Sequence, residues 1–284
     1  MENKIIITTE VSSDLSPELQ GKLGIKTIPL HVHLDGKEYL DGEVSNQFVY
    51  DTFMEKKVLP STSAVAVGEY ADFFEETAKN GETIIHIALS SGISSTYQNA
   101  VIAAEDVGED GTKVYVIDSK VLSSATGLLA YKAAEMAQAG VSAEEIVSVI
   151  TGYTEKMDNT FLITNLDFLR HGGRCSALAA LGANMLKLKP MINMAGGSMS
   201  VEKKYRGKVL DAYLEYADDR LGACDFDEEY ICIANCLVEE DMLDSIVKHI
   251  KSKYKAENII ITPCSTVISA HGGKGAFGVF LLKK

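Results

Sequence analysis

The chain has 284 residues, and a hydrophobic share of 46% gives it enough apolar side chains for a sizeable core, so its length predicts two domains. Its formal net charge of −13 argues against a nucleic-acid-binding protein, which needs a basic surface to displace counterions. The start runs directly into Ile5–Ile7 without a secretory leader pattern, and no apolar run reaches the roughly 18 residues of a membrane span. We therefore expect a cytoplasmic protein without stable membrane insertion.

The first half alternates short β-branched runs with helical patterns. Strands are predicted over Lys4–Thr9, Ile25–Val32, Thr83–Leu89 and Lys113–Ile117. Helices are predicted over Gly68–Lys79, Ser95–Asp106, Val121–Ala139 and Ser142–Lys156. Helix starts are marked by Ser16-Pro17 and by the capping-box patterns Ser95-x-x-Gln98 and Ser142-x-x-Glu145. This order predicts a parallel sheet with helices on both faces.

The second half has a different pattern. Strands are predicted over Thr160–Thr164, Pro190–Met194, Ser198–Lys203, Glu229–Asn235, Asn258–Thr262 and Ala276–Leu282, with helices near Asp211–Leu221 and Glu239–Tyr254. The Ala195-Gly196-Gly197-Ser198 stretch is typical of a hairpin and favours antiparallel pairing. The predicted fold is therefore α/β with two domains. Residues 1–157 would form an α/β/α domain on a parallel sheet, and residues 158–284 an α+β domain with a largely antiparallel sheet.

Two hydroxyl-rich segments are the main candidates for a binding site: Pro60-Ser61-Thr62-Ser63 and Ser90-Ser91-Gly92-Ile93-Ser94-Ser95-Thr96-Tyr97. Thr62 is expected in a loop ahead of a helix, and Ser94 at a strand-to-helix turn. Helix N-termini at the carboxyl ends of parallel strands favour anions, so a carboxylate or phosphate would fit here. The alternative is that these hydroxyls only cap helices and turns.

One function open to this hydroxyl-rich site is enzymatic: the protein would act there on a small carboxylated or phosphorylated substrate. This is the alternative to a binding protein that does not catalyse a reaction. The Gly-x-Ser-x-Gly motif of serine hydrolases and the glycine-rich nucleotide fingerprints are missing from the chain. The five cysteines lack paired metal-ligand spacing, so we expect packed thiols and neither a metal site nor a cofactor.

Further candidates lie in the second half. Arg170 and Arg174 bracket a turn and could hold an anion through their guanidinium forks, or could be solvated. His271 lies in a glycine-rich stretch, expected to be a flexible loop, where the backbone can approach a ligand closely. The Leu- and Met-rich segment between Ala177 and Met194 suits an adaptable apolar wall, or a plain core.

One basic segment departs from the acidic composition. It contains Lys187, Lys189, Lys203, Lys204, Arg206 and Lys208 against only Glu202. It is either a solvated face or a docking surface for an acidic partner or a phosphate.

Taken in order, the motifs resemble those of the DegV family nearly from end to end. The matching residues include Ile28-Pro29-Leu30, Tyr39-Leu40-Asp41-Gly42, Pro60-x-Thr62-Ser63, Leu89-Ser90-Ser91-x-Ile93-Ser94-x-Thr96-Tyr97, Leu169-Arg170-x-Gly172-Gly173-Arg174, Tyr205-Arg206-Gly207 and His271-x-Gly273-x-Gly275. The chain departs from the family pattern at Glu10 and Val11, at Ala64-Val65-Ala66, at Ser95 and at Lys274.

The resemblance implies a carrier that is not itself an enzyme. It implies a long-chain fatty acid, such as palmitate, buried between and within the two domains. Thr62 and Ser94 would bind the carboxylate, with Arg170 and His271 in the surrounding polar network. Arg206 would serve in presenting the acid to a partner, a bacterial fatty acid kinase that makes acyl phosphate.

Overall fold

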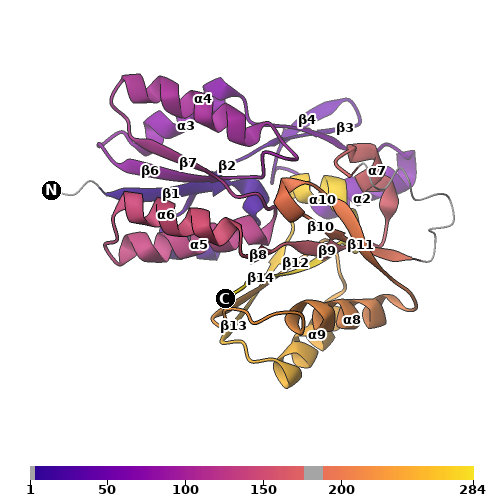
Figure 1. Cartoon of the computed structure of the whole chain (residues 1–284). Coiled ribbons are helices and arrows are strands. Elements are labelled where there is room, and N and C mark those ends of the chain that lie inside the picture. Colours follow the sequence, from indigo (N-terminus) through magenta and orange to yellow (C-terminus); the bar gives the residue numbers. More distant parts are fainter. Residues whose placement is uncertain (1–3, 176–187) are drawn as a thin grey trace.

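The computed structural model describes residues 4–175 and 188–284 (Figure 1). Its first sheet is parallel throughout, as predicted. The strands lie in the order β2 (Lys26–Ile28), β1 (Ile5–Glu10), β6 (Thr83–Ala88) and β7 (Val114–Asp118). Figure 1 shows helices α3 (Val67–Thr77) and α4 (Thr96–Glu109) on one face and α5 (Ser124–Gln138) and α6 (Ala143–Thr154) on the other. Helix α1 (Pro17–Leu23) begins after Ser16, which accepts the Leu19 amide, with Pro17 at the first helical position as predicted.

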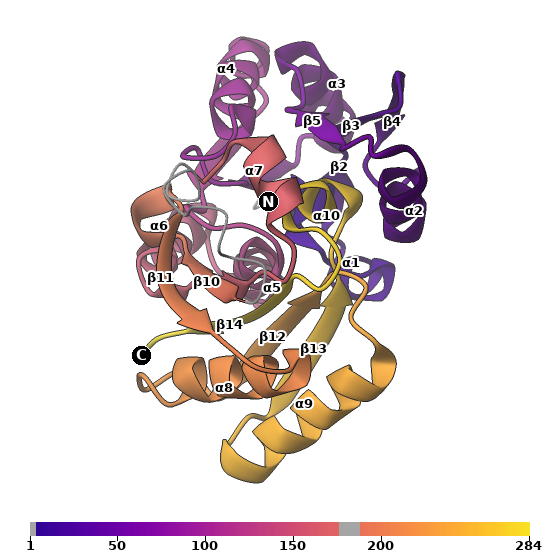
Figure 2. The ribbon, with the colours of Figure 1, turned by 90° about the vertical axis from the view of Figure 1, so that its right-hand side faces the viewer.

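The second sheet is largely antiparallel, which confirms the predicted fold class. Its strands lie in the order β11 (Ser200–Tyr205), β10 (Lys189–Asn193), β9 (Thr160–Leu162), β14 (Phe277–Leu282), β12 (Tyr230–Asn235) and β13 (Asn258–Pro263), and β8 (Met157–Asp158) pairs with β14. Only β12 and β13 pair in parallel among these described strands. Figure 2 shows α8 (Val209–Leu221) and α9 (Glu240–Lys253) on the side away from the first sheet. The predicted domain boundary between residues 157 and 158 falls within β8 and stays a prediction.

A third sheet corrects the prediction of a single strand over Ile25–Val32. Strand β2 ends at Ile28, and β3 (His31–Leu34) instead pairs antiparallel with β4 (Lys37–Leu40) and β5 (Ser61–Ser63). Pro29 lies between the two strands and has no amide hydrogen to continue the first ladder. Thr62 therefore lies on a short strand and not in a loop.

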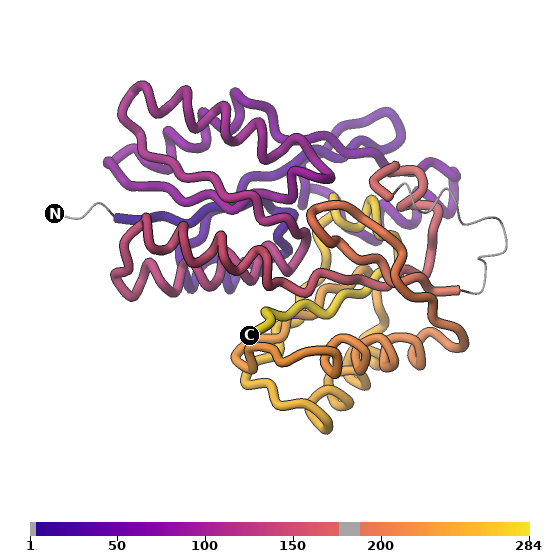
Figure 3. Tube along the Cα trace, in the orientation of Figure 1, coloured from indigo at the N-terminus to yellow at the C-terminus, as the bar shows by residue number. Residues whose placement is uncertain are grey.

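Among the described residues, three helices differ from the prediction by their presence: α2 (Asn46–Lys56), α7 (Leu166–Gly172) and α10 (Thr266–Gly272). His271 occupies the last turn of α10, so the expectation of a flexible loop is wrong. Helix α10 begins at Ser265, whose hydroxyl accepts the Ile268 amide, while the Asp41 carboxylate accepts the amides of Thr266 and Val267. Figure 3 follows this C-terminal segment back toward the first half of the chain, and α10 packs against α2 of that half and against α7.

The predicted capping boxes at Ser142 and Ser95 have different outcomes. Ser142 accepts the Glu145 amide at the start of α6, as its pattern predicts. Ser95 precedes α4 without a side-chain cap, because Ser94 accepts the Thr96 amide instead.

The turn Ala195–Gly197 joins the antiparallel strands β10 and β11, which confirms the predicted hairpin. Most of the Leu- and Met-rich segment, residues 177 to 187, lies outside the described residues.

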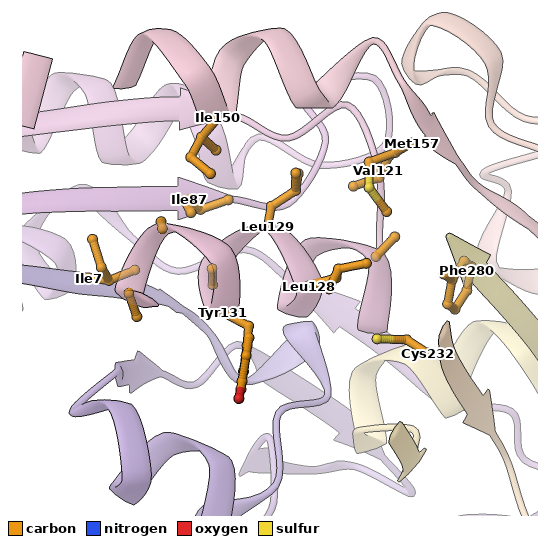
Figure 4. Packing of buried hydrophobic residues seen from close by; sticks show 14 of the residues in the cluster. Ile7, Ile87, Val121, Leu128, Leu129, Tyr131, Ile150, Met157, Cys232 and Phe280 are labelled. Carbon is orange, nitrogen blue, oxygen red and sulfur yellow. The ribbon is translucent and has the colours of Figure 1, made fainter. Parts of the chain in front are cut away.

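The two large sheets share one core around α5, in which residues 124 to 134 are all buried. Figure 4 shows Leu128 and Leu129 of α5 between Ile7 of the first sheet and Phe280 of the second. Burial of this helix on all sides explains its alanine-rich, almost uncharged sequence. No helix in residues 4–175 and 188–284 combines the length and apolar character that crossing a bilayer requires.

Candidate functional site

A narrow cavity lies between the two large sheets, and most of its wall is apolar. The space open to the centre of a water-sized molecule is about 80 Å³. The apolar lining is supplied by Leu30, Leu89, Ile93, Leu122, Phe161, Leu169, Met199, Ala234, Val267, Ile268, Ala276, Phe277, Gly278 and Phe280. Such a wall excludes water and suits a hydrocarbon chain.

Ser123, whose hydroxyl donates to Asp14, also lines the cavity, but most of the polar lining lies at one end. Thr62, Ser94, Arg174 and His271 line this end, and the exposed Ser63 stands beside them. The four come from different elements, namely β5, the turn after β6, the turn after α7 and the last turn of α10. Arg174 donates through Nε to the carbonyl of Ile93, at 3.4 Å, and thereby lies next to Ser94. Because Ser63 and Arg174 are exposed, this end faces solvent.

His271 and Thr62 form a hydrogen bond across the cavity, with 2.9 Å between Nε2 and Oγ1. The other ring nitrogen, Nδ1, has no hydrogen-bond partner among the described residues. Nδ1 faces Gly172, where an added Cβ would lie only 2.1 Å away, so glycine is required at that position. Burial and the positive charges of Arg174 and His171 lower the pKa of His271 to about 4. The imidazole is therefore neutral at neutral pH.

Ser94 lies in a turn that is held at several points. Its Oγ is 2.5 Å from Thr96 Oγ1. The Leu89 amide donates to the Glu10 carboxylate at 2.9 Å, and Ser91 donates its amide and hydroxyl to Asp118 at 3.1 and 2.6 Å. Anchored at both Leu89 and Ser91, the turn presents Ser94 to the cavity in a fixed position.

Glu10 belongs to a fully buried network that was not predicted from the sequence. Its Oε1 accepts from Tyr70 Oη at 2.6 Å and from His86 Nε2 at 2.9 Å. His86 Nδ1 in turn lies 2.9 Å from Thr8 Oγ1. A carboxylate at the end of a strand that begins with three isoleucines was the available signal, because a buried charge needs partners.

The structure thus places three of the predicted binding residues, Thr62, Ser94 and His271, around one cavity. Arg170 is exposed on α7 and is not among the lining residues, whereas Arg174 lines the polar end. Arg206 is exposed in the turn between β11 and α8, away from the cavity lining.

The basic segment divides into paired and unpaired cations. Lys189 is buried and donates to the Gly207 carbonyl, and Lys203 pairs with Glu215 and Asp219. Lys204, Arg206 and Lys208 are exposed and form no ion pair with a described residue.

Comparison with known proteins assigns this architecture to a family. The family model described as "Uncharacterised protein, DegV family" matches residues 4–284, so the chain belongs to the DegV family. A DegV domain-containing protein of Caldanaerobacter subterraneus subsp. tengcongensis is 32% identical over 284 residues, covering 99% of both chains. One from Listeria innocua is 32% identical over 286 residues, covering 98% of both.

Solved structures share the fold over the whole chain. DegV of Bacillus subtilis, described as a fatty acid binding protein, superposes with a TM-score of 0.86 at 27% identity, covering 100% of both chains. A DegV family protein of Thermus thermophilus, described by its fatty acid binding, reaches a TM-score of 0.89 at 24% identity, covering 99% of this chain and all of its own. At 24% identity, the similarity to the Thermus thermophilus protein establishes only that the two chains share a fold.

Proposed function

We propose that the protein binds a long-chain fatty acid, with the carboxylate held by Thr62 and Ser94 and the hydrocarbon chain in the apolar cavity. The observation that carries the proposal is the composition of that cavity, which joins a hydroxyl-rich, solvent-facing end to an apolar interior. The fatty acid binding described for the Bacillus subtilis relative supports it.

The Thr62–His271 pair suits a carboxylate ligand because of its protonation state. A neutral imidazole carries one N–H, and the Thr62 hydroxyl can accept it while donating its own hydrogen to the ligand. Arg174 supplies positive charge at the same end. Arg170, one turn earlier in sequence, would act in the outer part of this polar network and not against the carboxylate itself.

A binding role fits the hydroxyls better than nucleophilic catalysis does. Ser94 Oγ contacts Thr96 Oγ1 and the Thr96 amide, neither of which is a general base. His271 does contact the Thr62 hydroxyl, but with a pKa of about 4 it is a weak general base at neutral pH. We therefore favour a carrier over an enzyme acting on a small acid at this site.

Purified protein extracted with organic solvent should release a fatty acid that mass spectrometry identifies. Retention is expected because each buried methylene stabilises the complex by about 0.8 kcal/mol. After delipidation, the protein should take up palmitate or oleate. Protein that is consistently lipid-free and takes up neither acid would contradict the proposal.

We further propose that the bound acid is presented to a fatty acid kinase, which supplies ATP and forms the acyl phosphate. The surface that supports this step is the exposed cation cluster of Lys204, Arg206 and Lys208 on an otherwise acidic protein. Exposed charges of this kind mainly change association rates.

Arg206→Ala should therefore slow acyl-phosphate formation with the kinase of the same organism and leave fatty-acid affinity unchanged. Lys203→Ala is the matched control, because Lys203 is engaged by Glu215 and Asp219. The proposal would be contradicted if the Arg206→Ala variant lost its lipid, or if no such kinase phosphorylated the acid bound to the wild-type protein. A role in fatty-acid storage or transport would then take its place.

A further inference from the structure

The cavity has a definite inner end on strand β14. Ala276, which precedes the strand, and Phe277, Gly278 and Phe280 of the strand line the cavity, whereas Leu281 and Leu282 do not. On the neighbouring strand β12 the lining stops two residues earlier: Ala234, which pairs with Gly278, lines the cavity, and Cys232, which pairs with Phe280, does not.

The polar end lies at the opposite limit of these lining residues. Ala276 packs against Gly272, where an added Cβ would lie 2.8 Å from the Ala276 Cβ, and Gly272 directly follows His271. Along the extended strand Gly278 lies two positions beyond Ala276 and Phe280 four positions beyond it, or about 7 Å and about 13 Å. A chain held by its carboxylate near His271 therefore points toward Phe280.

The ring of Phe280 folds back over Gly278. An added Cβ at Gly278 would lie 2.4 Å from Phe280 Cζ and 2.8 Å from Cε2, so the ring occupies the space above the glycine on the cavity face of the strand. Phe280 is only 1% exposed, and behind it lies the shared core, with Leu128 and Cys232 nearby (Figure 4).

We propose that Phe280 is the end wall of the cavity and sets the longest acyl chain that the protein accepts, an inference that rests on the proposed fatty-acid binding. Gly278 allows Phe280 to take this position, because only a residue without a side chain leaves room for the ring that folds back over it. Phe280 acts as a specificity-determining residue and makes no contact with the carboxylate site.

The test compares delipidated wild type, Phe280→Ala and Phe280→Leu for binding of laurate, myristate, palmitate, stearate and arachidate. The preferred chain should lengthen in Phe280→Ala and shift less in Phe280→Leu, with each additional accepted methylene tightening binding about fourfold. Phe280→Leu also keeps the test valid if Phe280→Ala does not fold.

Leu282→Ala is the matched control. Leu282 lies two residues further on the same strand face, is 5% exposed and belongs to the same core cluster, but does not line the cavity. It should lose stability and keep the wild-type chain preference. An unchanged preference in both Phe280 variants would overturn the end-wall role, whereas a wild type that binds no member of the series would overturn fatty-acid binding itself.

Gly278→Ala tests the position of the ring independently. The new methyl group collides with the Phe280 ring, so it should lower the melting temperature of the wild type by more than that of the Phe280→Ala variant. An equal loss in the two backgrounds would contradict the folded-back ring.

Discussion

The molecule contains two threonine–histidine hydrogen bonds of equal length. Thr8 Oγ1 lies 2.9 Å from His86 Nδ1, and Thr62 Oγ1 lies 2.9 Å from His271 Nε2. Their surroundings differ. His86 uses its second nitrogen to contact Glu10, and the pair is fully buried, whereas His271 Nδ1 has no partner among the described residues and Thr62 lines a cavity.

The difference separates a structural network from the proposed binding site. Around Glu10 each donor already has its acceptor, so the network can stabilise the fold and has no place for a ligand. Thr62 lines the cavity, and in the tautomer with hydrogen on His271 Nε2 its hydroxyl can donate to a ligand there. Residue types alone do not distinguish the two threonine–histidine pairs. They are distinguished by whether the remaining polar atoms of each pair have hydrogen-bond partners.

The largest expected effect comes from removing the acceptor in the closed network. Glu10→Ala would leave the Tyr70 hydroxyl, His86 Nε2 and the Leu89 amide without their partner. The free energy of unfolding should fall by about 3–5 kcal/mol, measured by urea denaturation. Glu10→Gln, which keeps an acceptor oxygen, should lose less. A loss below about 1 kcal/mol in Glu10→Ala would show that the network is not a structural unit.

A pH-dependent effect distinguishes His271. Its pKa is about 4 when folded, below the ordinary value of 6.5, because burial and Arg174 disfavour the cation. The unfolded chain therefore binds more protons between these values, and the His271 contribution, fully present above pH 6.5, is lost as pH falls toward 4. The loss is on the order of 3 kcal/mol.

Buried Asp14 acts in the opposite direction, because burial raises its pKa to about 7. The comparison must therefore be a difference between wild type and His271→Gln. The stability advantage of the wild type should shrink on acidification from pH 7 to pH 4. A difference that does not change with pH would contradict a neutral, buried His271.

The smallest expected effects come from one substitution made at both pairs. Thr62→Val should weaken fatty-acid binding by about 1–3 kcal/mol, or roughly 5- to 150-fold, and cost little stability. Thr8→Val should lower the free energy of unfolding by a similar 1–3 kcal/mol and leave the affinity unchanged. Calorimetric titration and thermal unfolding measure the two effects. Identical behaviour of the two variants would remove the distinction between the pairs.

Much of the fold follows from local patterns, since β1, β6, β7 and helices α3 to α6 have clear periodicity and start signals. The unpredicted α10 depends on distant residues. Its first amides are bound by Asp41, about 225 positions earlier in the chain, and no sequence window contains both. The same long-range contact explains why His271 lies on a helix.

The site was predictable where a residue type alone indicated its chemistry. Thr62 and Ser94 belong to hydroxyl-rich segments, and His271 to a glycine-rich one. The distinction between Arg170 and Arg174 was not available, because it depends on how α7 ends: Gly173 has a φ of 66°, and Arg174 follows this left-handed residue toward the cavity. The buried network of Glu10 could not be predicted, because the sequence does not show that Tyr70 and His86 face this carboxylate.

The buried α5 helix constrains how a ligand can be exchanged. Moving the two large sheets apart would expose side chains packed between this helix and the second sheet (Figure 4), and exposing only Leu128, Met157 and Phe280 would cost on the order of 4.5–9 kcal/mol, at about 1.5–3 kcal/mol each. We therefore expect the layers to stay together during exchange. The fatty acid would then thread lengthwise, entering tail first and leaving head group first, and its residence time would rise with every methylene withdrawn through the polar end.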